Sequence, residues 1–235
     1  MAEPASPDSA STPPRVGAEC SCPADPRIAR HFDERMGRVA VAGELPEMVD
    51  VSRGLLELLA DVGELRPTVL ELGSGSGALT VALLERGAAR AVGVDLSAES
   101  VATARRRADQ AGVGSRASFE VGDGAQVALE EHDWVVLDRV ICCYAHVDPL
   151  LANSIAAAGR RYAFSVPHVG GWRGLVNRLI FIAERATDRL RRRPPCPGYM
   201  HSIGKIERRL AKAGFRPLRR RTAGLWYAAV FEREG

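Results

Sequence analysis

The sequence predicts an α/β fold in which a doubly wound, parallel sheet ends in an antiparallel hairpin. Two observations support this prediction. Short apolar segments of strand length alternate with longer segments of helical periodicity, and the tight turn Ala223-Gly224 joins two further strand-like segments near the end of the chain. The composition agrees, because hydrophobic residues make up 46% and charged residues 26% of the 235 positions, as in ordinary globular domains.

The pattern divides the chain into an extension and one domain. Residues 1–26 are rich in Pro, Ser and Ala and show no apolar periodicity, so we expect them to be disordered. Residues 27–235 are expected to form a single domain. It begins with a short helix at Arg27–Met36. A clearer helix follows at Met48–Val62, whose apolar residues recur at helical spacing: Val51, Leu55, Leu58, Leu59 and Val62.

Strands and helices alternate through the middle of the chain. Each expected strand is short and mostly apolar, the pattern of a parallel sheet that is covered on both faces. We predict strands at Thr68–Leu72, Arg90–Leu96, Ala117–Val121, Trp134–Leu137 and Tyr162–Val166. We predict the helices between them at Ala78–Arg86, Ala98–Ala111 and Pro149–Ala158.

The last third of the chain departs from this alternation. Trp172–Arg193 has the pattern of one long, amphipathic, Arg-rich helix that a proline-rich segment ends. Because this helix leaves the fifth strand at the edge where ligands of such sheets bind, we expect residues 171–200 to form a lid-like insertion. The elements predicted after it are a helix at Ser202–Ala213 and the hairpin strands Arg216–Thr222 and Leu225–Glu232.

Three signals for ligand binding each follow a predicted strand. The first strand runs into the glycine-rich turn E-L-G-S-G-S-G at residues 71–77, where the backbone can approach a ligand and the next helix offers its N-terminal amides. Asp95 ends the second strand and can accept hydrogen bonds from ribose hydroxyls. Asp123 follows the third strand, where an acid can meet the amino group of adenine. Together they indicate a nucleoside ligand at one edge of the sheet.

The nucleoside is predicted to be S-adenosylmethionine (SAM) rather than NAD. The glycines also fit a loose dinucleotide-binding pattern, Gly73-x-Gly75-x-x-Ala78. Glu71, however, directs a carboxylate toward the turn, which suits the cationic methionyl part of SAM and would repel a pyrophosphate. The C-terminal hairpin is also foreign to dinucleotide-binding sheets.

With these motifs, residues 67–143 resemble the core of class I SAM-dependent methyltransferases. The resemblance implies a Rossmann-like, seven-stranded sheet whose last strand is antiparallel, in agreement with the hairpin. It also implies that Arg27–Met36 covers the pocket, as N-terminal segments often do in that family. The expected cofactor-binding residues are Glu71, Gly73, Gly75 and Gly77 at the methionine end, Asp95 and Leu96 at the ribose, Asp123 and Gly124 at the adenine, and Asp138 after the fourth strand.

Further segments resemble the magnesium-protoporphyrin O-methyltransferases. The run D-R-V-I-C-C-Y at residues 138–144, the long helix after the fifth strand, and M-H-S-I at residues 200–203 all look like that family. The sequence departs from the pattern at Ala145, where we expect Pro, and at Cys143, where some members have His. The resemblance implies O-methylation of a small acceptor, and the departures leave the identity of that acceptor open.

Methyl transfer requires little acid–base chemistry from the protein. The sulfonium of SAM already activates the methyl group, so the protein must align the acceptor and exclude water. A carboxylate acceptor needs no base, whereas a hydroxyl or phenol usually does. Tyr144 and His146 are the candidate catalytic bases after the fourth strand, with His168 after the fifth as a further candidate.

The cysteines indicate packing rather than chemistry. No pair among Cys20, Cys22, Cys142 and Cys143 has the spacing of a zinc site, and free cysteines are commonly small buried hydrophobes. We therefore predict no metal ion. The odd number of cysteines, the start of the chain and the lack of a long apolar run favour reduced thiols and a cytoplasmic location.

The C-terminal third is strongly basic. From Val169 onward, 16 Lys and Arg stand against 5 Asp and Glu, which suits either a solvated face or an anionic partner. A nucleic-acid or protein methyltransferase would explain this charge. The run D-R-V-I after the fourth strand, however, lacks the Pro-Pro-aromatic pattern of base-methylating enzymes, so we expect no nucleic-acid partner. Peripheral docking of Trp172–Arg193 on an anionic membrane, as in a non-catalytic SAM-binding protein, is the other alternative.

The prediction from sequence is therefore an α/β, SAM-dependent methyltransferase. Its acceptor is expected to be a small, apolar or aromatic molecule, methylated at oxygen rather than at nitrogen or carbon. The sequence leaves the oligomeric state and the acceptor itself open.

Overall fold

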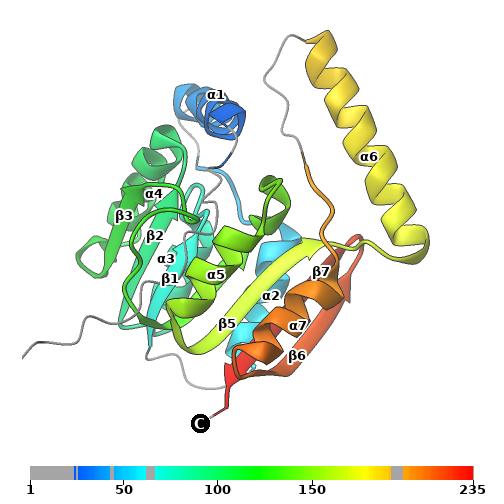
Figure 1. The fold of residues 1–235 in the computed structure, drawn as a ribbon. Helices are drawn as coiled ribbons and strands as arrows, with labels where there is room; N and C mark the ends of the chain where they lie inside the picture. The colour runs from blue at the N-terminus through cyan, green and yellow to red at the C-terminus, as the bar shows by residue number, and fades with distance from the viewer. Residues whose placement is uncertain (1–23, 25, 43–44, 62–66, 192–197, 235) are drawn as a thin grey trace, which may run out of the picture.

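The computed structural model describes residues 24, 26–42, 45–61, 67–191 and 198–234 of the chain. Its centre is a seven-stranded sheet of order β3-β2-β1-β4-β5-β7-β6 (Figure 1). The parallel strands are β1 Thr68–Leu72, β2 Arg90–Asp95, β3 Ala117–Val121, β4 His132–Asp138 and β5 Ala158–Pro167. The antiparallel hairpin of β6 Phe215–Ala223 and β7 Trp226–Arg233 completes the sheet, and β7 pairs with β5.

Helices cover both faces of the sheet. One face packs against α2 Asp50–Ala60, α3 Ala78–Glu85 and α4 Ala98–Gln110, and the other against α5 Asp148–Ala156 and α7 Ile203–Lys212. A parallel strand in such a fold is buried on both sides, which explains why the strands are mostly apolar in sequence.

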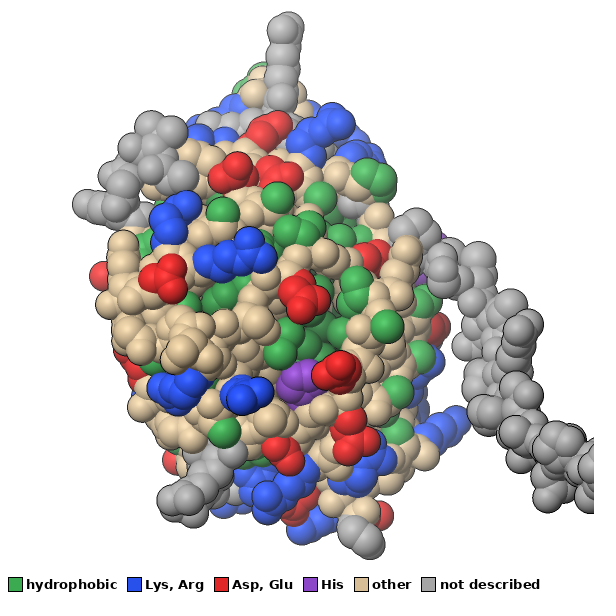
Figure 2. Space-filling model, turned by 90° about the vertical axis from the view of Figure 1, so that its left-hand side faces the viewer, with side chains coloured by type: hydrophobic (Ala, Val, Ile, Leu, Met, Phe, Trp, Pro, Cys, Tyr) green, Lys and Arg blue, Asp and Glu red, His purple; other side chains and the backbone are tan. Residues whose placement is uncertain are grey.

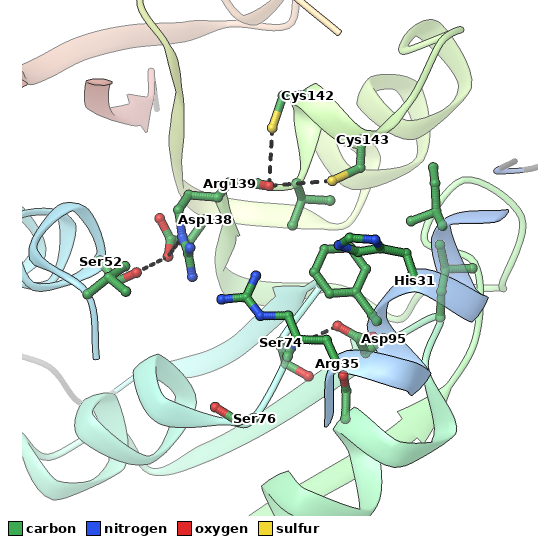
Figure 3. Close-up of a pocket in the computed structure, with 18 of the residues that line it drawn as sticks. His31, Arg35, Ser52, Ser74, Ser76, Asp95, Asp138, Arg139, Cys142 and Cys143 are labelled. Atoms are coloured by element: carbon green, nitrogen blue, oxygen red, sulfur yellow. Dashed lines mark hydrogen bonds and ion pairs between the residues drawn. The ribbon is translucent and has the colours of Figure 1, made fainter. Parts of the chain in front are cut away.

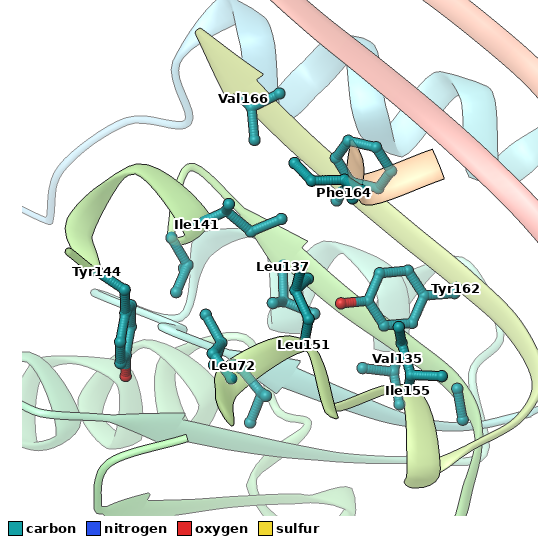
Figure 4. Packing of buried hydrophobic residues seen from close by; sticks show 14 of the residues in the cluster. Leu72, Val135, Leu137, Ile141, Tyr144, Leu151, Ile155, Tyr162, Phe164 and Val166 are labelled. Carbon is teal, nitrogen blue, oxygen red and sulfur yellow. The ribbon is translucent and has the colours of Figure 1, made fainter. Parts of the chain in front are cut away.

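Strand β4 shows this two-sided burial directly. Trp134 and Val136 belong to the core under α2, α3 and α4, whereas Val135 and Leu137 belong to the core under α5 and α7, as the alternation of side chains along a strand requires. Figure 4 shows part of the second core, where Tyr162 of β5 lies near Val135. This packing fixes the carboxyl ends of the strands at one edge of the sheet.

The predicted fold class is confirmed. A strand or helix is present at every segment predicted from Thr68 onward, with ends shifted by four residues or fewer where they are described. The hairpin turn is also present, and Gly224 has the positive φ of 56° that such a tight turn favours. The end of the predicted helix Trp172–Arg193 lies outside the described residues.

The N-terminal helix α1 is longer than predicted, spanning Pro26–Ala42. It packs along α4, and Asp33 accepts hydrogen bonds from the Ser97 hydroxyl at 2.6 Å and from the Glu99 N–H at 3.3 Å. These contacts join residues far apart in the sequence, so the local sequence pattern could not predict the full length of α1. Of residues 1–26, predicted to be disordered, only Ala24 and Pro26 are described. Ala24 is buried and Pro26 begins α1, and the remainder of the segment lies outside the described residues.

Helix α6 (Gly171–Leu190) extends away from the sheet and its covering helices (Figure 1). Gly174 and Asn177 are its only buried residues. One apolar face of the helix is open to solvent, with Trp172, Leu175 and Leu179 exposed to 64%, 61% and 58%. Across the described residues, no helix is long and apolar enough to cross a membrane.

Candidate functional site

A cavity of about 760 Å³ lies at the carboxyl ends of β1, β2 and β4, the edge at which ligands bind in open parallel sheets. Its volume falls within the range of roughly 300–1,000 Å³ that small-molecule sites occupy. Helices α1 and α6 supply further walls, so the predicted cover by the N-terminal helix is present in this structure. Figure 3 shows side chains from α1, α2 and three strand ends around this cavity.

The glycine turn after β1 is shaped by its left-handed backbone. Gly73, Gly75 and Gly77 have φ values of 69°, 52° and 74°, a region that other residues rarely adopt. A Cβ on Gly73 would also stand 2.1 Å from a methyl of Val140, and one on Gly77 would stand 2.8 Å from the Cβ of Ala104. Gly73 and Gly75 line the cavity, whereas Gly77 lies behind them and precedes α3. The turn can therefore present its backbone to a ligand.

Asp95 is oriented by two backbone donors at the end of β2. One carboxylate oxygen accepts the N–H of Gly75 at 2.8 Å, and the other accepts the N–H of Ser97 at 2.9 Å. Burial raises the pKa of this carboxyl above its ordinary value, and the two hydrogen bonds oppose that effect. Each oxygen keeps a further lone pair for a ligand donor, as a pair of ribose hydroxyls would require.

Glu71 is a buried carboxyl beneath the glycine turn. Its Oε2 accepts a hydrogen bond from the hydroxyl of Thr80. Burial raises the pKa of Glu71 to about 8, with smaller contributions from Asp138 and Asp95, against the lowering effect of Thr80. A cationic ligand beside this carboxyl would favour its ionised form.

Ser74 provides an independent sign of a polar ligand. Within the described part of the chain, its hydroxyl oxygen is buried and has no hydrogen-bond partner, although the residue lines the cavity. Buried polar atoms are nearly always paired. Together with the lone pairs of Asp95 and the carboxyl of Glu71, this hydroxyl fits the polar groups of SAM.

Asp138 joins the end of β4 to α2. Its carboxylate accepts hydrogen bonds from the hydroxyls of Ser52 and Ser165 and lies 3.4 Å from Nε of Arg139. Arg139 has a φ of 59°, the one positive value at a non-glycine residue among those described. Such strain is typical of functional sites. The left-handed backbone at Arg139 turns the chain after β4, so that Arg139 and Val140 both line the cavity.

Asp123 and Tyr144 are hydrogen-bonded to each other beside the cavity. The Tyr144 hydroxyl donates to Oδ1 of Asp123 at 2.8 Å, and the Ala24 N–H donates to Oδ2 at 2.7 Å. Tyr144 lines the cavity, but Asp123 does not. In this structure the carboxylate of Asp123 instead holds Tyr144 and the N-terminal segment in place. Burial and the neighbouring carboxylate raise the pKa of Tyr144 well above its ordinary value. The phenol is therefore a poor general base at neutral pH.

The histidines also differ from the prediction. His146 is exposed, and neither it nor His168 lines the cavity. The imidazole in the cavity is His31 of α1, which was not among the predicted site residues, and Figure 3 shows it near Arg35. His201 is a further omission, because its Nε2–H donates to the Tyr144 carbonyl at 2.7 Å and holds the segment before α7 against this loop.

Cys142 and Cys143 are buried free thiols that line the cavity. Both sulfurs point at the carbonyl of Arg139, at 3.3 Å and 3.7 Å. Cys20 and Cys22 lie outside the described residues. Among the residues that the structure does describe, no group of three or more His, Cys, Asp or Glu side chains is placed to hold a metal ion.

The cavity has a polar end and an apolar end. Glu71, Ser74 and Asp95 mark the polar end, and Leu96 and Gly124 line the cavity beside it. The residues of the apolar end come from several elements: Ile28, Phe32 and Met36 of α1, Val140 after β4, and Ile180 and Phe181 of α6. The α1 and α6 residues in this set belong to segments that were predicted to cover the pocket, although none of them was singled out individually.

Residues 69–161 match the family described as Methyltransferase domain. The chain is 37% identical over 106 residues to ribosomal RNA small subunit methyltransferase A of Prochlorococcus marinus, and 32% identical over 124 residues to ribosomal protein L11 methyltransferase of Salmonella arizonae. These segments cover 44% and 52% of this chain. They cover only 36% and 37% of the two relatives, so the chain spans little more than a third of their lengths.

The fold is similar to the crystal structure of magnesium protoporphyrin IX methyltransferase from Synechocystis PCC 6803 with bound SAH. The TM-score is 0.69 at 20% identity, over 89% of this chain and 100% of that chain. This likeness shows the fold, including the antiparallel end of the sheet. The fold predicted for a methyltransferase is therefore confirmed, and the family match over residues 69–161 supports the prediction that SAM is the cofactor.

Proposed function

We propose that this chain, which carries the domain of class I SAM-dependent methyltransferases, moves the methyl group of SAM to an oxygen atom of a small, apolar or aromatic acceptor. The observation that carries the proposal is the cavity with its two unlike ends. One end offers the carboxyls and hydroxyl that a nucleoside with a cationic tail requires. The other offers apolar walls beside it, where an acceptor can meet the methyl group.

The polar end is proposed to hold the cofactor. Asp95 would accept the ribose hydroxyls, Glu71 would face the methionyl cation, and the unpaired hydroxyl of Ser74 would bind a polar group of the same ligand. Bound SAM supplies a methyl group already activated by its sulfonium. Supporting roles are proposed for Gly73, Gly75 and Gly77 in shaping the turn, for Leu96 and Gly124 in lining it, and for Asp138 in holding α2 beside it.

The apolar end is proposed to align the acceptor and exclude water. Phe32 of α1 and Phe181 of α6 both line the cavity and would give the acceptor apolar walls. Exclusion of water and a fixed approach of the acceptor oxygen account for much of the rate that such an enzyme needs.

The acceptor oxygen can be activated in two ways by the side chains present. Arg35 and Arg139 direct guanidinium groups toward the cavity (Figure 3), and a carboxylate held by them would need no base. A hydroxyl would need one, and the imidazole of His31 is the base candidate within the cavity. Replacement of His31 by Gln separates the two cases, because it would abolish methylation of a hydroxyl but spare methylation of a carboxylate.

A macromolecular acceptor is the second candidate function. The two curated relatives are named as methyltransferases of ribosomal RNA and of a ribosomal protein, and the C-terminal third of this chain is basic. The apolar walls from α1 and α6 favour a small acceptor, because they narrow the space beside the cofactor end.

The test is methyl transfer from labelled SAM to separate classes of acceptor: aromatic and porphyrin carboxylates, phenols, ribosomal RNA and ribosomal protein. We expect label in a small acceptor, strong loss of label with Asp95→Ala, and no loss with Glu85→Gln, an exposed carboxyl at the end of α3. Label that enters only RNA or protein would overturn the proposal of a small acceptor. A chain that binds SAM but labels no acceptor would overturn the proposal of an enzyme.

A further inference from the structure

The outward side of α6 carries an apolar stripe. The stripe follows the helix at intervals of three and four residues, which places its members in one row. It consists of Trp172, Leu175, Leu179, Ile182, Ala186 and Leu190, all of them exposed. The large members are exposed to between 58% and 86%. Large apolar side chains gathered in this way on one exposed helix face commonly mark an interaction surface.

Arginines border this outer stripe along one edge. Arg178 and Arg189 each precede a stripe residue by one position, and Arg185 does the same in the middle of the helix. On the other edge, Ile180 and Ala183 each follow a stripe residue and line the cavity. The row spans 18 positions, or roughly 27 Å at the rise of an α-helix.

The acidic residues of α6 lie on a different side. Glu184 and Asp188 line the cavity together with Ile180 and Phe181, whereas the charged residues beside the outer stripe are arginines. The face of the molecule in Figure 2 is different, because basic and acidic side chains are mixed there around central hydrophobic ones. The pairing of an apolar row with charge of one sign is therefore a feature of α6.

We propose that the outer stripe of α6 docks the protein on an anionic lipid surface, with the helix lying in the plane of the interface. Apolar side chains would enter the boundary between headgroups and acyl chains while the flanking arginines meet lipid phosphates. A second copy of the chain is a poorer occupant, because stripes packed against each other would bring arginine rows of like charge together. Trp172, beside the Arg173 guanidinium at 4.8 Å, is a residue type favoured at membrane interfaces.

This proposal is independent of which acceptor is methylated. The adjoining side of the same helix lines the cavity, so docking would bring the cavity close to the lipid surface and to apolar molecules dissolved in it. That consequence rests on the proposed function, whereas docking itself can be measured without any acceptor.

The test is co-sedimentation of the full chain with phosphatidylcholine vesicles, with and without phosphatidylserine. We expect binding that requires phosphatidylserine and falls as salt is raised, since salt screens exposed charges. Replacement of both Arg178 and Arg189 by Gln should weaken it roughly 25-fold, from about fivefold for each basic residue near such a surface. The matched control replaces Arg86 and Arg90, two exposed arginines at the opposite end of the sheet, by Gln.

The apolar contribution is tested separately with Leu179→Asp, whose control is Val121→Asp at an exposed position of the edge strand β3. Leu179→Asp should reduce vesicle binding, and Val121→Asp should not. Melting temperature and SAM affinity, measured in parallel, should stay unchanged in all variants. Binding that is indifferent to phosphatidylserine, or equal in the α6 variants and the controls, would overturn the proposal. So would a concentration-dependent dimer that Leu179→Asp dissociates.

Discussion

Glu71 makes cofactor binding depend on pH. In the ligand-free chain, burial raises the pKa of this carboxyl from 4.5 to about 8, so it is mostly protonated at neutral pH. A cationic methionyl group next to it favours the carboxylate, and binding must therefore release a proton. Below the pKa the affinity changes almost tenfold for each pH unit, which gives a rise of roughly 20-fold between about pH 6 and pH 7.5.

The same pKa has a consequence for stability, with a definite sign. The folded-state value lies above the unfolded value, so the folded chain binds the extra proton. The contribution is fully present below about pH 4.5 and is lost as pH rises through about 8. The whole change corresponds to roughly 4–5 kcal/mol. We expect the ligand-free chain to lose stability over this range, and Glu71→Gln to lose less than the natural chain.

Calorimetric titration with SAM measures both effects of Glu71. Buffers of different ionisation enthalpy should reveal release of nearly one proton near neutral pH. Glu71→Gln should bind weakly at every pH without this release, while the exposed control Glu85→Gln should behave like the natural chain. An affinity that stays constant from about pH 6 to pH 7.5, or a pH dependence that survives in Glu71→Gln, would refute the reasoning.

Three further predictions concern the same site. Asp95→Ala should weaken SAM binding by about 1.5–3 kcal/mol, the value of a hydrogen bond to a charged group; calorimetry showing unchanged affinity would remove Asp95 from the ribose. Tyr144→Phe should leave the shape of the pH–rate profile unchanged, because its hydroxyl is a donor to Asp123; loss of an alkaline limb would restore Tyr144 as a base. Gly73→Ala should lower the melting temperature more than Gly75→Ala. Both glycines have positive φ, but only a Cβ at Gly73 would collide with Val140. Equal falls in melting temperature would contradict this explanation.

The part of the site that the sequence predicted depends on local backbone chemistry. The turn needs glycines because its φ values are positive at three alternate positions. Asp95 is set by its place at the end of β2, where the turn and the start of α4 supply its two N–H donors. Such features follow from a strand and the few residues after it, so a single sequence suffices to locate them.

The rest of the site depends on contacts between distant segments. His31 and Arg35 reach the cavity only because α1 lies across the sheet edge, held by Asp33 at the start of α4 and by the Ala24 N–H at Asp123. Asp123 and Tyr144 were each placed in the site by their position after a strand. No local pattern shows that their side chains bond to each other across 21 positions of the sequence.

Helix α6 shows how an amphipathic pattern can be assigned to the wrong surface. The apolar row with Leu179 has the spacing of a buried helix face, but Leu179 is 58% exposed and it is Phe181, two positions on, that lines the cavity. We therefore expect Phe181→Ser to reduce turnover through weaker acceptor binding while SAM affinity and vesicle binding stay unchanged. Leu179→Asp should do the reverse: an exposed substitution costs within about 0.5 kcal/mol of stability, and it should spare turnover with a water-soluble acceptor. If Leu179→Asp abolished that turnover and Phe181→Ser did not, the outward row would be the substrate face, and the assignment of the two sides of α6 would be wrong.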